Sequence, residues 1–419
     1  MGTSPTDSPH LGATALTDTA PRRMNAEAAK PVQVASRPAA DFLARFREEA
    51  DAHEMSFEHF MRLALYDPQV GYYTRARRRI GRGARGGGGG QSDFLTATTV
   101  GEGHGTSSGT NLFGELVVQS CLSLAGEAFC AKATFVEIGA EPQGGPAATH
   151  SNAGGEARAG TDRSPVPRGG VLRGLRELPF AAVKTISVGE DLAQLLKAPS
   201  SEAAPEKRAA APPLIVFSNE LFDAQPCRRF VLRDSAWREI WVRSTNEGAL
   251  AEVEHALENP PDFLPKTAAQ GYRIDAPVAA RQLLAQIAGA DWRGLFIAFD
   301  YGKSWRELCE ATPQGTARAY TRHRQSGALL DQPGEQDLTC HVCWDWLQAE
   351  LAQRGFGSIA LDSQEAFFVK HASGFIAQTI AADARQLSPR KQALMQLLHP
   401  ANMGQKFQAL SARRGLSPE

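Results

Sequence analysis

Three clusters of polar residues stand directly after apolar segments, and they are the places where this sequence could carry chemistry. They are Glu137 with Gly139, then Asn219 with Glu220 and Asp223, then Asp300 with Tyr301 and Gly302. In an open parallel sheet, ligands bind outside the carboxyl ends of the strands, where the strand order reverses. Acids there can accept hydrogen bonds from a ligand, and glycines let the main chain come close to it. The sequence therefore predicts a small-molecule site at one edge of a parallel α/β sheet.

The apolar segments before these clusters predict the strands that would position them. Leu214–Phe217 and Leu295–Phe299 are continuous apolar runs, as expected for strands buried on both faces of a parallel sheet. Phe135–Ile138 and Val183–Val188 predict two more strands of the same sheet. The other predicted elements are two helices between Ala40 and Ala64 with Ser56 as an N-cap, helices over Leu112–Phe129, Val171–Leu178 and Trp344–Arg354, a hairpin between Arg229 and Val242, helical structure over 247–290, a strand near Ile359, and helices from there to about Leu410.

Composition excludes several classes of protein. The chain has 419 residues and a formal net charge of −1, so no overall field favours nucleic acid or an anionic membrane. No apolar run approaches the ~20 residues that a membrane-spanning helix needs. Six scattered cysteines fit a reducing compartment, and we expect a cytoplasmic protein. Residues 1–40 predict a disordered tail without the features of a secretory or transit peptide, which makes a mitochondrial location the less favoured alternative.

Seven short motifs occur along the chain in an order that resembles a known family. They are Asp67-Pro68-x-x-Gly71-Tyr72-Tyr73, Asp93-Phe94-x-Thr96, Phe113-Gly114-Glu115-Leu116, Asn219-Glu220-x-Phe222-Asp223-Ala224-x-Pro226, Asp300-Tyr301-Gly302, Gly315-Thr316-x-Arg318-Ala319-Tyr320 and Pro333-Gly334-x-x-Asp337-Leu338-Thr339-x-His341. This order is similar to that of the MidA-type S-adenosylmethionine-dependent methyltransferases. That group includes the mitochondrial protein-arginine methyltransferase that assists complex I assembly. The resemblance covers roughly residues 42–360.

The resemblance implies a fold, a cofactor and a reaction. The expected fold is the class I methyltransferase fold, a Rossmann-like, mostly parallel seven-stranded sheet with N-terminal helices and inserted elements. The expected cofactor is S-adenosyl-L-methionine, and the expected acceptor is a partner protein, through an arginine side chain. The corresponding regions are a tail (1–40), an N-terminal helical or lid region with a Gly-rich insertion (41–111) and a methyltransferase-like domain (112–419), with low-complexity insertions near 146–170 and 199–213 and a hairpin or helical insertion near 229–290.

The resemblance also implies roles for individual residues. On the cofactor side, Glu137 and Gly139 would meet the methionyl and ribose portions, Gly144 would give the loop flexibility, Glu190 or Asp191 would accept the ribose hydroxyls, and Asp300 with Tyr301 would form the floor. On the acceptor side stand the predicted catalytic residues Asn219, Glu220 and Asp223, because a carboxylate can pair with a guanidinium in a bidentate manner. Asp223 could instead be a helix cap and Asn219 a turn residue. The later motif residues Arg318, Tyr320, His323, Asp337 and His341 could bind substrate or brace loops.

The first loop departs from the family pattern of an acid followed by Gly-Pro-Gly-x-Gly. Glu141 and Gln143 occupy the second and third glycine positions, and Gly144 and Gly145 follow late. Two alternatives to a protein methyltransferase therefore stay open: a catalytically silent relative that serves as an assembly or binding protein, and a methyltransferase for a small molecule. No metal is expected, because Cys340 and Cys343 lack the second pair that a structural zinc site needs.

Overall fold

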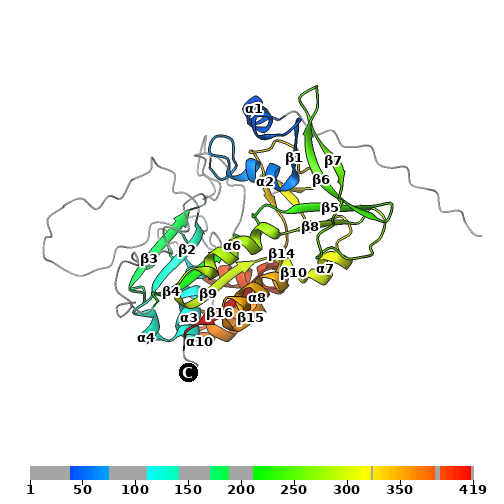
Figure 1. The fold of residues 1–419 in the computed structure, drawn as a ribbon. Helices are drawn as coiled ribbons and strands as arrows, with labels where there is room; N and C mark the ends of the chain where they lie inside the picture. The colour runs from blue at the N-terminus through cyan, green and yellow to red at the C-terminus, as the bar shows by residue number, and fades with distance from the viewer. Residues whose placement is uncertain are drawn as a thin grey trace, which may run out of the picture. The chain divides into compact units, whose positions relative to one another are not determined.

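The largest sheet in the computed structural model has six strands in the part of the chain that is described, residues 38–74, 111–140, 170–187, 211–321, 324–382 and 387–416 (Figure 1). The strands are β2 (Thr134–Ala140), β3 (Ala182–Ser187), β4 (Pro213–Asn219), β9 (Arg293–Asp300), β15 (Gly357–Ser363) and β16 (Gln408–Arg414), in the order β15-β16-β9-β4-β2-β3. The four strands β3, β2, β4 and β9 are parallel, whereas β16 is antiparallel to both of its neighbours. The predicted α/β class is thus confirmed, with six of the seven expected strands among the described residues.

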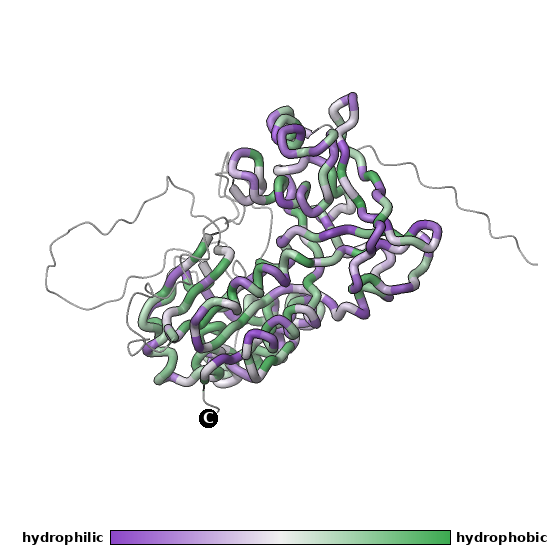
Figure 2. Tube along the Cα trace, in the orientation of Figure 1, coloured by the Kyte–Doolittle hydropathy of each residue, from purple (hydrophilic) through white to green (hydrophobic). Residues whose placement is uncertain are grey.

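Hydrophobic side chains cover both faces of this sheet, because successive residues of a strand point to opposite sides. On one face, Ile215 and Phe217 of β4 pack with helices α3 (Leu112–Ala125), α9 (Gln364–His371) and α11 (Pro389–Leu398). On the other face, Val216 packs with α6 (Val278–Gly289) and α8 (Trp344–Gln353). Figure 2 shows the hydrophobic residues gathered along these strands. The continuous apolar runs of the sequence are therefore explained by burial on both sides.

The strand order reverses between β2 and β4. The chain passes from β2 to β3 on one side of β2, and then returns to form β4 on its other side. Such a reversal leaves room for a ligand beyond the carboxyl ends of the two strands. These ends carry Glu137 with Gly139 on β2 and Asn219 with Glu220 at the end of β4.

A second sheet is antiparallel and covers the region predicted as hairpin and helix. Its strands are β1 (Glu54–Ser56), β5 (Arg228–Arg233), β6 (Ala236–Ser244), β7 (Leu250–Ala256) and β8 (Arg273–Ala276). The hairpin prediction is confirmed, and Trp237 lies in β6 opposite Leu232 of β5. The prediction of helical structure over 247–290 is wrong for β7 and β8, because β7 is paired along its whole length with β6. Only α6 in this range is a helix of the expected kind.

The two N-terminal helices are confirmed. They are α1 (Ala40–Glu49) and α2 (Phe57–Tyr66), and the Ser56 hydroxyl accepts a hydrogen bond from the backbone N–H of His59, as an N-cap does. Phe42 and Phe46 of α1 are fully buried in a cluster that includes Cys227 of the second sheet region and Leu338. The N-terminal helices are therefore packed against segments that lie far away in sequence.

The remaining described elements are short. They are α4 (Glu127–Cys130), β10 (Gly302–Lys303), α7 (Trp305–Glu310), β11 (Arg318–Thr321), β12 (Arg324–Ser326), β13 (Asp337–Thr339), β14 (Val342–Cys343), α10 (Ser373–Ala382) and the π-helical turn η2 (Pro400–Gly404). None of the helices that the structure describes is long and apolar enough to cross a bilayer.

Two further predictions are corrected. Residues 171–178 form turns and not a helix, and the backbone N–H of Val171 is bonded to the Glu137 carboxylate. The predicted C-terminal helices end before β16, which inserts between β9 and β15. Residues 1–37 of the predicted tail (1–40) and most of the low-complexity insertions lie outside the described residues, so the predicted region boundaries stay predictions.

Candidate functional site

Glu137 and Gly139 shape the end of β2. The Glu137 carboxylate is 6% exposed and accepts a hydrogen bond from the Val171 backbone N–H at 2.7 Å. Burial raises the pKa of Glu137 to about 7, although this hydrogen bond opposes the rise. Gly139 has φ +88°, and a Cβ there would lie 2.8 Å from the Leu221 side chain. The glycine is thus required where β2 leaves its regular pairing with β3.

The end of β4 has a strained backbone. Glu220 has φ +50°, in the left-handed region that non-glycine residues rarely adopt, and its backbone N–H donates to the carbonyl of Phe299 at 2.9 Å. The Asn219 amide donates to the Glu220 carboxylate at 3.0 Å, while the Asn219 side-chain oxygen is buried without a hydrogen-bond partner. Backbone strain of this kind is concentrated at functional sites, in agreement with the place of this turn at the carboxyl end of β4.

Asp300, at the end of β9, holds the turn that follows β4. One of its oxygens accepts from the backbone N–H groups of Phe222 at 2.9 Å and Asp223 at 3.3 Å, and the other from Tyr301 at 2.9 Å. Asp300 is fully buried. Its described contacts are therefore with the main chain, in agreement with a place on the floor of the site.

Asp223 is the second buried carboxylate of this turn. It is 3% exposed, receives a hydrogen bond from the Tyr301 hydroxyl, and keeps its Oδ1 atom without a partner. Its main-chain carbonyl accepts from the N–H of Cys340 at 2.8 Å, which joins the turn to the segment before His341. Burial raises the pKa of Asp223 to about 6. Burial also raises the pKa of Asp300 well above its ordinary value, and repulsion by the Asp223 carboxylate raises it further.

Tyrosines from the N-terminal region reach the same turn. The Tyr66 hydroxyl donates to the carbonyl of Ala224 at 2.9 Å, and the Tyr73 hydroxyl donates to the Asp337 carboxylate at 2.8 Å. The two rings stack with their centres 5.6 Å apart. Burial raises the pKa of both tyrosines, and the charges of Asp337 and Asp223 add to this rise. The rings and the carboxylates therefore share one region, which we call the acid–tyrosine cluster: Glu220, Asp223, Asp300, Asp337, Tyr66, Tyr73, Tyr301 and Tyr320.

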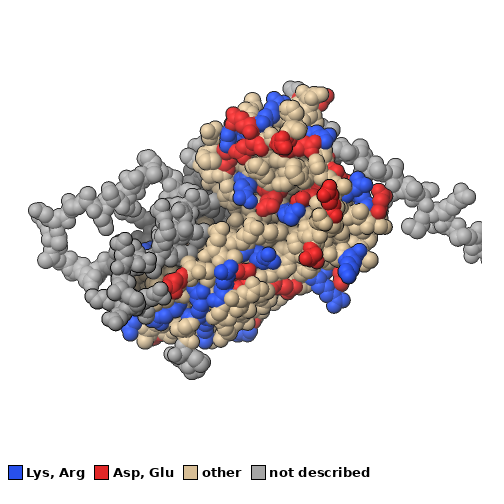
Figure 3. All heavy atoms as spheres, in the orientation of Figure 1, with Lys and Arg blue, Asp and Glu red and all other residues tan. Residues whose placement is uncertain are grey.

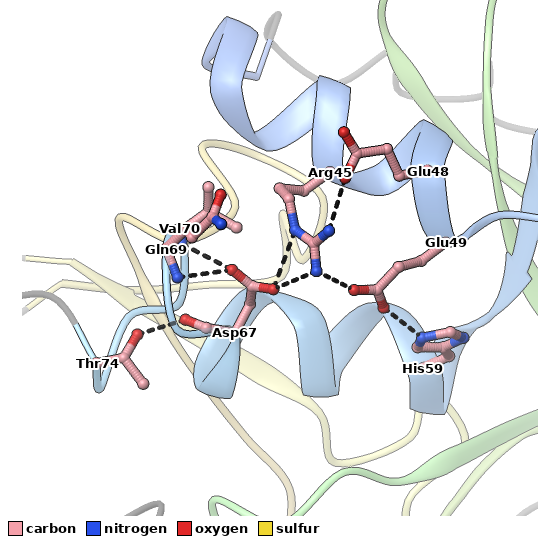
Figure 4. Close-up of polar contacts among 8 residues, drawn as sticks. All are labelled: Arg45, Glu48, Glu49, His59, Asp67, Gln69, Val70 and Thr74. Atoms are coloured by element: carbon pink, nitrogen blue, oxygen red, sulfur yellow. Dashed lines mark hydrogen bonds and ion pairs between the residues drawn. The ribbon is translucent and has the colours of Figure 1, made fainter.

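The motif beginning at Asp67 places Tyr73 in this cluster. The Asp67 carboxylate accepts from the backbone N–H groups of Gln69 and Val70 and from Arg45 of α1, as Figure 4 shows. A Cβ on Gly71 would lie 2.6 Å from the main chain of Asp67, so the tight turn requires glycine. The chain then runs back along α2 toward Asp337.

A second turn supports the first. Gly334 has φ +79°, and a Cβ there would lie 2.2 Å from the carbonyl oxygen of Val70. The Pro-Gly motif and the Asp67 motif, about 260 residues apart in sequence, thus meet at one contact. Together the two turns bring the Tyr73 hydroxyl within hydrogen-bond distance of the Asp337 carboxylate.

A buried ion pair in the second sheet fixes the segment next to His341. Arg229 is bonded to Asp275 at 2.7 Å, and Asp275 also accepts from the backbone N–H groups of Thr316 and Ala317. Burial acts to raise the pKa of Asp275, but Arg229 and these hydrogen bonds hold it below its ordinary value. The Thr316 hydroxyl in turn accepts from the N–H of His341 at 3.2 Å. A Cβ on Gly315 would lie 2.3 Å from the Asp275 carboxylate, so these contacts account for the glycine and the threonine of this motif.

His341 is kept neutral at this position. Burial lowers the pKa of its imidazole to about 4, and the charges of Lys303 and Arg318 act in the same direction. Its ring packs edge-on against Tyr301, with the ring centres 5.5 Å apart. It therefore adds no positive charge beside the carboxylates.

The structure brings together most of the residues predicted from the sequence. Asn219, Glu220, Asp223 and Asp300 lie at adjoining strand ends, and Glu137 and Gly139 lie on the neighbouring strand. Gly144, Glu190, Asp191 and His323 lie outside the described residues, together with Glu141 and Gln143. The sequence analysis missed Tyr66, Tyr73 and Asp275 as parts of the site. Their only signal was that Tyr73 and Gly315 belong to recurring motifs.

Among the described residues, no group of histidine, cysteine and acidic side chains is arranged to hold a metal ion. What the site offers is a set of buried polar atoms without partners at one sheet edge. These are Ser218 Oγ, Asn219 Oδ1, Asp223 Oδ1 and His341 Nδ1. Unpaired buried polar atoms are rare in folded proteins, so they indicate a place where a polar ligand completes the hydrogen bonds.

Solved structures place the chain in a class of folds. A COG1565 superfamily member from Burkholderia thailandensis, crystallised with S-adenosyl-homocysteine, superposes with a TM-score of 0.64 at 20% identity over 92% of this chain and 96% of that chain. The native structure of a protein of the same superfamily and organism gives 0.61 at 21% identity with the same coverage. The fold is thus that of a Rossmann-like methyltransferase with an added N-terminal region and antiparallel sheet.

A family match narrows this class. Residues 192–359 match the family described as "Putative S-adenosyl-L-methionine-dependent methyltransferase". The match includes the strand ends of β4 and β9 and the motif at Asp337. It confirms the resemblance that the order of motifs predicted. No curated protein matches the chain in sequence.

Proposed function

We propose that this protein transfers a methyl group from S-adenosylmethionine to a cationic nitrogen, and that the acceptor is an arginine side chain of a partner protein. The observation that carries this proposal is the acid–tyrosine cluster beside the reversal of strand order. Four carboxylates stand there among tyrosine rings, and three of them, Asp223, Asp300 and Asp337, are buried. Such surroundings suit a cation with hydrogen-bond donors.

The residues at the sheet edge fit the cofactor. The relative that was crystallised with S-adenosyl-homocysteine has the same fold, and β2 and β4 end where that fold class binds its ligand. Gly139 leaves the end of β2 without a side chain, and the unpaired Asn219 oxygen can accept a hydrogen bond from a ligand amino group or hydroxyl. We therefore assign Gly139 and Asn219 to the cofactor side, with Glu137 supporting the loop through Val171.

The bound cofactor supplies a methyl group already activated by its sulfonium charge. The task of the chain is then to align an acceptor nitrogen with that methyl group and to exclude water. The nitrogen that gains the methyl group loses an N–H proton, which a carboxylate of the cluster would accept and pass to solvent. A guanidinium beside a sulfonium puts two positive charges close together, and buried carboxylates offset this repulsion. Glu220 and Asp223 would take this role, since both stand at the end of β4 next to the cofactor side.

An arginine is favoured over a lysine by geometry. A planar guanidinium presents several N–H donors and can stack against tyrosine rings, whereas an ammonium is a compact charge without a flat face. On the face shown in Figure 3, acidic and basic side chains are intermixed over the antiparallel sheet, in line with ion pairs such as Arg233–Glu254. This mixed surface supports a protein partner and not a nucleic acid. The seven-stranded class I sheet and a cytoplasmic location are parts of the same proposal.

Calorimetry with S-adenosylmethionine and S-adenosylhomocysteine tests the cofactor assignment. Binding of both at micromolar to millimolar concentration is expected, and no heat at millimolar ligand would favour the silent-relative alternative. Glu220→Ala should then abolish methyl transfer from labelled cofactor to arginine-containing peptides while cofactor affinity stays nearly unchanged. The matched control is Glu307→Ala, an exposed glutamate that caps α7. Loss of both cofactor binding and transfer in Glu220→Ala would show that Glu220 belongs to the cofactor side.

A further inference from the structure

Two buried carboxyl groups in the acid–tyrosine cluster have no described basic partner. Asp300 is 0% exposed and Asp223 is 3% exposed, and both belong to one turn because Asp300 accepts from the Asp223 backbone N–H. No lysine, arginine or histidine in the described parts of the chain forms an ion pair with either group. Within the described part of the chain, the pair therefore has no basic side chain to compensate its negative charge.

Two adjacent ionised carboxylates in such surroundings repel each other, and each also loses its hydration. The usual outcome is that the two groups share one proton. The geometry favours the proton on Asp223, because both Asp300 oxygens accept backbone N–H groups while Asp223 Oδ1 has no partner. The direction of both pKa shifts agrees with a retained proton, since burial raises the pKa of each group.

The groups that face this pair do not supply the missing positive charge. From β4 and the motif segments come Glu220, Asp337, Tyr301 and Tyr320, and from the N-terminal region come Tyr66 and Tyr73; the Cys340 thiol also faces Asp223. Two basic residues of the described chain belong to the same motifs: His341, which packs against Tyr301 and is neutral, and Arg318, whose guanidinium donates to the carbonyls of Gly315 and Ala317. The described residues therefore leave the charge of the pair without a counter-charge, which a cationic ligand can supply.

We propose that the Asp223–Asp300 pair is a proton-exchanging cation site, which holds one proton in the free protein and releases it when the guanidinium of the acceptor binds. This proposal rests on the proposed function and adds to it a coupling between acceptor binding and proton release. The guanidinium brings one positive charge and N–H donors, so the second carboxylate ionises and its unpaired oxygen gains a partner. The O–H bond of the carboxylic acid breaks and the proton passes to solvent, while the acceptor remains a cation.

The linkage predicts how acceptor affinity depends on pH. At pH values below the pKa of the free pair, binding of the acceptor must displace the shared proton. Each further decrease of one pH unit should therefore weaken acceptor binding about tenfold. Above that range, affinity should be independent of pH and no proton should be released. With the pKa of Asp223 near 6, the change falls between about pH 5 and pH 7.

The experiment is calorimetric titration of the full chain, saturated with S-adenosylhomocysteine, with methylguanidinium as the probe. At pH 5.5 we expect release of about three quarters of a proton per bound probe, measured by comparing two buffers of different ionisation enthalpy, and at pH 8 we expect almost none. Binding without proton release at either pH would overturn the proposal, as would no binding of the probe at all. Binding of S-adenosylhomocysteine alone reports on the cofactor assignment separately, so failure of the two ideas can be told apart.

Two variants sharpen the test. Asp223→Asn cannot exchange the proton, so it should lose the proton release and bind the probe at least tenfold more weakly at pH 8. Asp234→Asn, at the exposed tip of the β5–β6 hairpin, is the matched control and should behave as the unmodified chain. Unchanged proton release in Asp223→Asn would overturn the assignment. The result in the unmodified chain decides the proposal even if Asp223→Asn fails to fold.

Discussion

Replacement of Asp223 by asparagine should make the folded protein more stable at pH 8. The side chain is buried, carries an unpaired oxygen and lies next to a second buried carboxylate. Natural binding sites often hold groups that lower stability for the sake of function. Asparagine has nearly the same shape but no charge, so the variant removes the repulsion and leaves the backbone contacts of Asp300 in place.

The magnitude follows from the shift of the Asp223 pKa from an ordinary 3.8 to about 6 on folding. A raised pKa means that the folded state holds the proton more tightly than the unfolded chain. The corresponding stability is fully present below pH 3.8 and is lost as pH rises through 6. The loss amounts to about 3 kcal/mol at pH 8 and to about half of that at pH 5. Imperfect hydrogen bonding of the amide reduces the expected gain at pH 8 to about 2 kcal/mol.

Urea unfolding of the unmodified chain and the variant at pH 8 and pH 5 measures this difference. The midpoint of Asp223→Asn should lie at higher urea at pH 8, and the advantage should shrink at pH 5. Asp234→Asn, which is exposed, should show no difference at either pH. A variant that is less stable than the unmodified chain at pH 8 would refute the reasoning, because it would mean that the ionised Asp223 is stabilised within the free protein.

Three further outcomes are expected in the same unfolding assay. Glu220→Gly should be about 1 kcal/mol more stable than Glu220→Ala, because only glycine adopts φ +50° without strain; equal stability would argue against the left-handed turn. Gly334→Ala should cost roughly 3 kcal/mol, since its Cβ would lie 2.2 Å from the Val70 carbonyl oxygen, and a cost below 1 kcal/mol would contradict that contact. Arg229→Met should cost about 3–5 kcal/mol by leaving Asp275 buried without its partner, and the added change Asp275→Asn should recover part of the loss.

The parallel part of the fold could be predicted from the sequence because its signal is local. The strands β4 and β9 are continuous apolar runs followed at once by polar clusters, and both were placed within a residue or two. The strand β16 was missed for a physical reason. Its sequence Gln-Ala-Leu-Ser-Ala-Arg-Arg has few β-branched residues, and it becomes a strand because β9 and β15 hydrogen-bond to it from both sides.

The site could be predicted only in part for a similar reason. Asn219, Glu220 and Asp223 follow one strand, so their proximity is visible in the sequence. The hydrogen bond between Tyr73 and Asp337 depends on two turns, at Asp67 and Gly334, that meet only in the folded chain. The sequence around either residue does not indicate that contact. The motifs include the residues of both turns, but these residues are needed because one turn packs on the other.

The place of β16 has a consequence for the order in which the protein can fold. This strand is the last one described in the chain, yet it lies inside the sheet, between β9 and β15. During synthesis, one edge of β9 stays unpaired until residues 408–414 have been made, more than a hundred residues later. Because β9 is strongly apolar, this unpaired edge can pair with strands of other chains and cause aggregation. The nascent protein is therefore expected to depend on chaperones until its final strand is in place.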